Sequence, residues 1–317
     1  MSLWIYNKSK EKQYNMKIFI NEINESWIVD RFRNEWYETN PEISTDKIKE
    51  ANIIWIMSPW TWNKISKKQL KQKKVICTIH HIDFENFKKK EFIKLDKYVD
   101  FYHVISKKTE EQVRELTNKK IICIPFWFNP KIWNEITNKD SLRKSFGLEK
   151  NDYLIGSFQR DTEGKDLKSP KLIKGPDIFL DIVKDIYRSN KNLKVVLTGY
   201  RRNYLIKNFE VAKIPYVYFE MVDLEMLNKL YNILDLYVVA SRNEGGPQAI
   251  LECAASKTPI VSTDVGIASQ ILSEKSIYSP NKFHNATPDT DYAYRQSLNF
   301  KLPEGMKPFR KMFIESI

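Results

Sequence analysis

Short apolar runs alternate with longer amphipathic stretches along most of this 317-residue chain. Each amphipathic stretch, such as "SWIVDRFRNEWYE" in the N-terminal half, has the periodicity of a helix with one apolar face. Strands and helices that alternate in this way are typical of α/β proteins with parallel sheets. The predicted strands are 17–20, 51–57, 75–79, 101–105 and 121–126, followed by 153–158, 194–199, 216–221, 236–241 and 259–263.

A polar segment at 134–150 separates the two groups of strands and is the predicted linker. We therefore expect a short N-terminal domain, 1–140, and a C-terminal domain, 150–280. Two such domains would form a cleft at their interface, where ligands bind beyond the carboxyl ends of the strands. The alternation is lost in the C-terminal segment 281–317, and one alternative for this segment is a return to the N-terminal domain.

Glycine is unevenly distributed along the chain. There are nine glycines, and the first is Gly147. The N-terminal half therefore cannot contain a glycine-rich phosphate-binding turn. If a nucleotide binds, we expect the C-terminal half to hold most of it.

Composition limits the class of protein. No stretch approaches eighteen consecutive apolar residues, and the N-terminus has no hydrophobic run typical of a signal peptide. The three cysteines, Cys77, Cys123 and Cys253, lie in separate apolar stretches, as expected of reduced core residues in a cytoplasmic protein. The net charge of +12 indicates anionic partners, although lysine-rich genome composition is an equal alternative.

The stretch "SRNEGGPQAILECAASKTPIVSTDVG", residues 241–266, predicts a ligand site. An apolar strand ends just before it, and Pro247 is placed for the first position of the next helix. The start of such a helix presents backbone N–H groups and a partial positive charge. Gly245 and Gly246 carry no side chain, so an anion or a polyol can approach this backbone closely.

Two carboxylates flank the glycine turn. Glu244 precedes it, and Glu252 lies on the second helical turn, where its side chain leans back toward the helix start. Glu252 is suited to accept hydrogen bonds from the vicinal hydroxyls of a ribose, and Gln248 belongs to the same predicted donor-binding set. Two glutamates eight positions apart are by themselves commonplace in a chain with 29% charged residues. The strand, glycine turn and helix around them favour a sugar-nucleotide site.

In this stretch the sequence resembles the retaining glycosyltransferases of family 4, which have the two-domain GT-B fold and a Glu-x7-Glu motif. The likeness spans about 150–275 and is strongest at 236–272, where "TDVGIASQI" follows one β-α unit after the motif. The resemblance implies an α/β protein with two Rossmann-like domains facing a central cleft. It also implies that a sugar moves from a nucleotide-diphosphate donor to a glycan, polysaccharide or lipid-linked acceptor.

The resemblance assigns two cations to the donor diphosphate. "GSFQRD" and "KGPDIFL" match the segments that supply them, here Arg160 and Lys174. Cleavage of a glycosyl–diphosphate bond develops negative charge on the leaving phosphate, which fixed cations stabilise by several kcal/mol. The alternative is that both residues are solvated surface cations.

The N-terminal half matches the family more loosely. "CTIHHIDF" resembles the strand whose terminal histidine faces the donor sugar, which makes His80 the candidate, with His81 as its competitor. "VDFYHVISKKTEEQ" resembles the next strand with its serine, Ser106. Gln270 replaces the usual glutamate, and the N-terminal domain is short. These departures concern the acceptor more than the donor.

The predicted catalytic set is Glu244, His80, Arg160 and Lys174, with no metal and no cofactor besides the donor substrate. Asp289 and Asp291 form one Asp-x-Asp in a turn-like context, and no cysteine–histidine spacing indicates zinc. A role in cell-envelope polysaccharide synthesis is expected. The alternatives are a sugar-nucleotide epimerase of related fold and a non-catalytic nucleotide-sugar-binding or scaffold protein.

Aromatic residues and lysines lie together in two N-terminal segments. Trp60 and Trp62 precede a lysine-rich stretch, and the segment 83–92 interleaves three phenylalanines with Lys88, Lys89 and Lys90. This pattern suits the inner face of a membrane or an anionic glycan. Nucleic acid is not expected, because no nucleic-acid-binding fold accompanies the charge. A solvated lysine face with buried aromatics is the remaining alternative.

Overall fold

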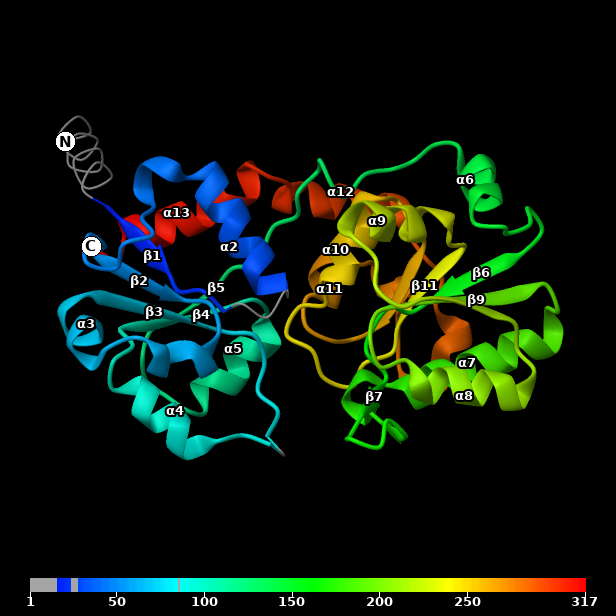
Figure 1. The fold of residues 1–317 in the computed structure, drawn as a ribbon, viewed down its shortest axis with the longest axis horizontal. Coiled ribbons are helices and arrows are strands. Elements are labelled where there is room, and N and C mark those ends of the chain that lie inside the picture. Colours follow the sequence, from blue (N-terminus) through cyan, green and yellow to red (C-terminus); the bar gives the residue numbers. More distant parts are fainter. Residues whose placement is uncertain (1–15, 24–27, 85) are drawn as a thin grey trace. The chain divides into compact units, whose positions relative to one another are not determined.

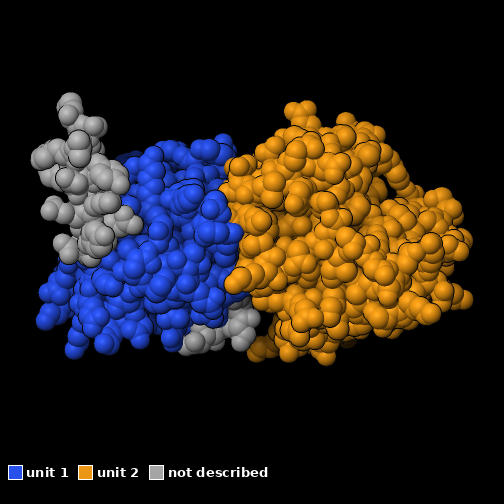
Figure 2. Space-filling view, turned by 90° about the horizontal axis from the view of Figure 1, so that it is seen from above, with its two compact units in different colours: residues 1–127, 302–317 blue, residues 128–301 orange. Residues whose placement is uncertain are grey.

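The computed structural model describes residues 16–23, 28–84 and 86–317. The chain divides into two compact units, drawn in different colours in Figure 2. Unit 1 comprises Met1–Trp127 and Leu302–Ile317, and unit 2 comprises Phe128–Lys301. The last sixteen residues therefore belong to the N-terminal unit, whereas the polar segment 134–150, predicted as the linker, belongs to unit 2.

Unit 1 contains a parallel sheet of five strands in sequence order. Its central strands are almost completely buried, as expected when helices cover both faces of a parallel sheet. The strands are β1 (Ile18–Ile20), β2 (Ile53–Ile56), β3 (Lys74–Ile79), β4 (Phe101–Val104) and β5 (Ile121–Cys123). The helices are α2 (Ile28–Thr39), α3 (Lys67–Gln72), α4 (Lys89–Asp96), α5 (Lys107–Arg114) and α13 (Lys307–Ile314).

The C-terminal helix α13 completes the core of unit 1. In Figure 1 this red helix lies beside α2 and the first strands of the sheet. Phe309 and Phe313 of α13 are fully buried, and the Phe313 ring lies 5.1 Å from that of Trp55 on β2 and 5.3 Å from that of Trp36 on α2. Aromatic rings at these separations and inclined to one another pack favourably.

A histidine lies in the middle of this sheet. His103 on β4 is fully buried, and its Nε2 lies 2.7 Å from the Ile124 carbonyl oxygen, to which it donates. Its Nδ1 then accepts a hydrogen bond from Thr78 Oγ1 at 2.9 Å, and that oxygen accepts one from Trp55 Nε1 at 2.8 Å. Burial lowers the pKa of His103 from 6.5 to about 3, so the ring is neutral in the folded protein at neutral pH.

We expect His103 to make unit 1 sensitive to acid. In the unfolded chain a histidine with a pKa near 6.5 is protonated below that pH, whereas folded His103 is not. The free energy of unfolding is therefore highest above pH 6.5 and falls by about 1.4 kcal/mol per pH unit for this group as the pH drops toward 3. Urea unfolding of the wild type and His103→Gln between pH 7 and 4 should show a shallower slope in the variant. The same change at the exposed His284 is the control, and equal slopes for wild type and His103→Gln would refute the prediction.

Unit 2 contains a parallel sheet of six strands in the order β10-β9-β6-β11-β12-β13. The strands are β6 (Tyr153–Gly156), β9 (Leu193–Thr198), β10 (Tyr216–Phe219), β11 (Leu236–Val239), β12 (Ile260–Thr263) and β13 (Ile277–Tyr278). The chain builds outward from β6 to β10 and then returns to place β11 on the other side of β6. This is the Rossmann-like order, and its switch point lies between β6 and β11.

Most helices of unit 2 follow the strands that the sequence predicts. They are α7 (Pro176–Ser189), α8 (Asn203–Ala212), α9 (Leu224–Ile233), α10 (Gln248–Ala255) and α11 (Ala268–Ile271). The segment predicted as a linker instead forms α6 (Lys139–Ser145), because Arg143 is buried and donates to the Ile233 carbonyl. Helix α12 (Thr290–Ser297) and the hairpin of β7 (Thr162–Glu163) and β8 (Ser169–Pro170) lie outside the predicted elements.

Candidate functional site

The candidate site lies at the carboxyl ends of β6 and β11. The two strands are neighbours, with Ile155 paired to Leu236 and Gly156 paired to Tyr237. The loop that follows β6 carries Arg160, and the loop that follows β11 carries the glycine turn. In an open α/β sheet, ligands usually bind beyond the carboxyl ends of the strands at the switch point, and both of these loops carry polar groups there.

Lys174 and Glu244 are brought together across this switch point. Lys174 Nζ lies 2.5 Å from Glu244 Oε1, and both side chains are mostly buried. The same carboxylate oxygen accepts hydrogen bonds from Ser241 Oγ at 3.2 Å and Gln159 Nε2 at 3.3 Å. Gln159 Oε1, at 2.9 Å, is an alternative acceptor for the same Ser241 hydroxyl, so these four side chains form one network.

Lys174 is positioned by a short 3-10 helix, Leu172–Lys174. Gly175 ends this helix with a positive φ of 64° and at the same time precedes α7, whose first residue is Pro176. The loop after β11 is fixed to the same turn, because Arg242 N donates to Ile173 O at 2.9 Å. Strong backbone constraints therefore hold Lys174 beside Glu244.

Arg160 is oriented by the β7–β8 hairpin. Its Nε donates to Thr162 O at 2.9 Å. Burial, followed by the neighbouring charge of Arg201, lowers the pKa of Arg160. Arginine remains charged in proteins despite such a shift, so Arg160 is a cation at this site.

Lys171 is a third cation at this site, and the sequence interpretation missed it. Burial lowers its pKa, and the next causes are the positive charges of Lys174 and Arg160. Glu163 and Glu244 act in the opposite direction but more weakly. A signal was available in "KLIKG", because Lys171 lies only three residues before Lys174. Three cations and the carboxylates of Glu163 and Glu244 are therefore electrostatic neighbours in this region.

The glycine turn is packed against a second loop. Gly245 is buried, and a Cβ at Gly266 would lie 2.5 Å from its carbonyl oxygen, so the two backbones touch. Pro247 was predicted at the first helical position, but this is wrong. It is the N-cap of α10, which begins at Gln248. The ψ of 111° at Pro247 is extended, so the backbone has not yet entered the helix. Gln248 Oε1 is buried and has no hydrogen-bond partner among the described residues.

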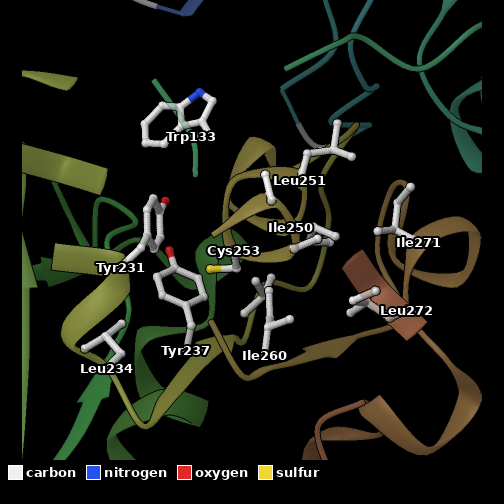
Figure 3. Close-up of a cluster of buried hydrophobic side chains, with 14 of the residues drawn as sticks. Trp133, Tyr231, Leu234, Tyr237, Ile250, Leu251, Cys253, Ile260, Ile271 and Leu272 are labelled. Atoms are coloured by element: carbon white, nitrogen blue, oxygen red, sulfur yellow. The ribbon is translucent and has the colours of Figure 1, made fainter. Parts of the chain in front are cut away.

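Glu252 lies on α10 and is only 5% exposed. Its Oε2 accepts a hydrogen bond from Tyr231 Oη of α9 at 2.9 Å. Figure 3 shows Tyr231 and Tyr237 side by side next to Cys253 in the buried cluster that underlies this helix. The carboxylate predicted to bind ribose is thus held at the edge of the core by a buried phenol.

The N-terminal candidates lie in unit 1. His80 follows β3, donates from Nε2 to Met57 O at 2.8 Å and stacks on Phe126 with ring centroids 6.0 Å apart. Burial lowers the pKa of His80 to about 4, so its ring is neutral at pH 7. Ser106 is fully buried and caps α5 by accepting a hydrogen bond from Thr109 N at 3.2 Å, so its hydroxyl has a structural role. His81 is partly exposed.

The described part of the chain shows neither a cluster of metal-ligating side chains nor a membrane-spanning helix. In residues 16–23, 28–84 and 86–317, no group of three or more histidine, cysteine, aspartate or glutamate side chains is arranged to hold a metal ion. In the same ranges, no helix is long and apolar enough to cross a bilayer.

Residues 168–286 match the family model described as "Glycosyl transferases group 1". This segment contains Lys171, Lys174, Glu244 and Glu252, whereas Arg160 and His80 precede it. No curated protein matches the chain.

Several solved structures resemble this one over most of the chain. HepE (Alr3699) of Anabaena in complex with UDP-glucose has a TM-score of 0.73 and 12% identity, covering 95% of this chain and 100% of its own. For sucrose-phosphate synthase of Thermosynechococcus elongatus the values are 0.66 and 14%, with 89% and 80% covered. For TarM of S. aureus they are 0.60 and 17%, with 85% and 54% covered. The likeness confirms the predicted fold class, α/β of the GT-B type.

Proposed function

We propose that this protein is a retaining glycosyltransferase that moves a sugar from a nucleoside diphosphate to a glycan, polysaccharide or lipid-linked acceptor. The observation that carries the proposal is the convergence of Arg160, Lys171 and Lys174 beside Glu244 at the switch point of unit 2. The match of 168–286 to glycosyl transferases group 1 supports it, as does the fold shared with a UDP-glucose complex.

The chemistry follows from where charge develops. When the bond between the sugar and the diphosphate breaks, the leaving diphosphate gains negative charge. Arg160 offers a planar fork of donors and Lys174 a compact charge, and such preorganised groups in a desolvated site stabilise the transition state. Glu244 and the backbone of Gly245 and Gly246 would contact the donor sugar. No residue is assigned as a nucleophile.

The remaining candidates have supporting roles in the proposal. Glu252 would accept hydrogen bonds from the ribose hydroxyls. His80, in unit 1, is a candidate for the donor sugar through the family resemblance alone. Because the cationic side chains balance the diphosphate charge, we further propose that the reaction needs no metal ion.

The proposal is tested first by binding and then by turnover. A thermal-shift series with UDP, GDP, ADP and their sugar conjugates should identify a ligand, since a ligand at one hundred times its Kd stabilises the folded state by about 2.7 kcal/mol. The labelled donor is then incubated with the protein in EDTA. Transfer or slow hydrolysis supports a metal-independent transferase. An isomerised sugar still attached to the nucleotide supports an epimerase, and binding without turnover supports a scaffold protein.

Replacement of Glu252 tests the ribose assignment. Glu252→Ala should weaken nucleoside diphosphate binding by about 1–3 kcal/mol, because two hydroxyls lose a charged acceptor. Calorimetric titration measures the loss. Tyr231→Phe is the control, because it removes the same internal hydrogen bond but keeps the carboxylate. If Glu252→Ala binds as tightly as the wild type, the ribose assignment is wrong.

Only some of the aromatic residues in the two lysine-rich segments of unit 1 are exposed. Phe84 and Ile93 are 53% and 49% exposed near the exposed Lys88, Lys89 and Lys90. Trp60 is also exposed, whereas Phe92 is buried and Trp62 stacks on Tyr98. Two apolar side chains beside three lysines form a small surface with the composition of a peripheral membrane contact.

We propose that this surface binds anionic membranes. Each lysine near such a surface contributes about 1 kcal/mol, and the attraction decays within about 8–10 Å at physiological salt. Co-sedimentation with acidic vesicles should therefore decline with salt and be lost when Lys88, Lys89 and Lys90 are changed together to Gln. The donor affinity should not change. A matched control removes three exposed lysines of unit 2, namely Lys144, Lys207 and Lys213. No sedimentation with acidic vesicles at low salt would refute the proposal.

A further inference from the structure

The loop that carries Arg160 is held by a single buried guanidinium, that of Arg202. Arg202 follows β9 and is only 1% exposed. Its Nη2 donates to Ser157 O at 2.6 Å, and its Nη1 donates to Gln159 O. The Gln159 carbonyl belongs to the peptide bond that leads into Arg160, so Arg202 fixes the backbone immediately before the candidate residue.

The other side of Arg160 is held by the same side chain. Arg202 Nε lies 2.8 Å from Asp161 Oδ2 in an ion pair whose two side chains are 0% and 2% exposed. The Asp161 carboxylate also accepts a hydrogen bond from Thr162 Oγ1 at 2.6 Å. In addition, Asp161 N and Thr162 N both donate to Arg201 O, at 3.3 and 3.1 Å.

Arg160 therefore lies between two neighbours that one guanidinium anchors. We propose that Arg202 is a positioning residue for the donor site, which acts by setting the direction of Arg160. This inference rests on the proposed function, because it assigns Arg202 a part in binding the donor diphosphate. Arg202 itself does not touch the ligand.

Stability alone is a weak reason for such a pair. Removing two charges from water costs several kcal/mol, and apolar replacements of a buried ion pair are often as stable. The guanidinium does orient the loop backbone, since a planar fork with several donors can hold more than one carbonyl group at once. Arg202 donates to three carbonyls, of which Ser157 O and Gln159 O are in the loop before Arg160 and Thr198 O, at 3.5 Å, ends β9.

The chain offers a matched control in Arg143. This arginine is also buried, donates to the Ile233 carbonyl at 2.9 and 2.7 Å, and pairs with Asp235 at 2.6 Å. It lies at the amino ends of the strands, away from the candidate site, since Asp235 directly precedes β11 and accepts from Leu154 N at the start of β6. The effect of replacing a buried arginine can thus be measured both next to the candidate site, at Arg202, and away from it, at Arg143.

The experiment compares Arg202→Lys with Arg143→Lys. Each keeps a positive charge beside its aspartate and loses the planar fork. Affinity for the tightest-binding of UDP, GDP and ADP is measured by calorimetry, with inorganic pyrophosphate as a probe independent of the base. We expect Arg202→Lys to weaken binding at least tenfold and Arg143→Lys less than twofold, with both proteins folded by circular dichroism.

A double-mutant cycle separates positioning from general loosening. In the Arg160→Ala background, Arg202→Lys should cost less than a further twofold, because the residue through which it acts is already gone. If Arg202→Lys does not fold, the variant that combines Asp161→Asn with Arg202→Gln removes both charges and should show the same tenfold loss.

The outcomes distinguish the two proposals. A wild-type protein that binds neither the three nucleotides nor pyrophosphate would overturn the proposed function and this inference with it. If the wild type binds and the folded Arg202 variant binds within twofold, the inference alone is overturned. A tenfold loss that persists in full without Arg160 would also overturn it.

Discussion

Lys174→Ala is expected to lower the turnover number by about two to three orders of magnitude while raising the KM for the donor much less. The partner of Lys174 in the proposed reaction is the leaving diphosphate, whose negative charge grows as the glycosyl bond breaks. An interaction that strengthens in the transition state affects kcat, whereas one of constant strength affects KM. Arg160→Ala should act in the same direction.

The geometry supports a large effect at Lys174. Its side chain is only 21% exposed, so water screens its charge weakly. The 3-10 turn and the Glu244 carboxylate at 2.5 Å hold the ammonium in place before any ligand arrives. No reorganisation is then needed at the moment of reaction, which is the condition for electrostatic preorganisation.

Lys194 is a control of similar environment. Its side chain is 25% exposed and pairs with Asp152 at 2.8 Å, but it lies on β9 opposite Leu154, at the start of the strands. Lys194→Ala should cost some stability and leave kcat and KM nearly unchanged. Steady-state kinetics with a labelled donor measures both variants. Should Lys174→Ala raise KM with kcat intact, Lys174 would be a ground-state binding residue only.

The fold could be predicted from the sequence because its main strands are buried. A strand that is covered on both faces is apolar along its whole length, as in "ANIIWIM" and "LYVVAS", and stands out against its surroundings. Helix α13 was not predicted. Its aromatic face finds its partners, Trp36 and Trp55, more than 250 residues earlier in the chain, and no local pattern carries that information.

Candidate site residues could be named from the sequence where the pattern is local. The glycine turn and its two glutamates lie within nine residues, and the Gly175–Pro176 start of α7 lies next to Lys174. Gln159, Ser241 and Arg202 were missed, because each contributes through contacts with residues at least 40 positions away or through backbone carbonyls. Polar residues that act by holding a loop have no sequence signature of their own.

Gly175→Ala is expected to destabilise unit 2 strongly, by about 2–4 kcal/mol. Gly175 has a φ of 64°, where an alanine is strained by about 1 kcal/mol. A Cβ there would also lie 1.8 Å from the Ala240 carbonyl oxygen and 2.6 Å from its carbon. Both atoms are backbone at the end of β11, so relief requires the strand end or the start of α7 to move.

Gly147 separates the two contributions. It has nearly the same φ, 67°, yet a Cβ there would meet nothing within 4 Å. Gly147→Ala should therefore cost only the conformational strain of about 1 kcal/mol, and the excess loss in Gly175→Ala measures the clash. Urea unfolding followed by tryptophan fluorescence compares the two variants. Because Gly175 directly follows Lys174, the Gly175 variant should also lose nucleoside diphosphate affinity, whereas Gly147→Ala should keep it. Equal losses of stability in the two variants would contradict the prediction, because they would show that the backbone of β11 and α7 shifts at little cost. Lys174 would then be held less rigidly than the turn geometry indicates.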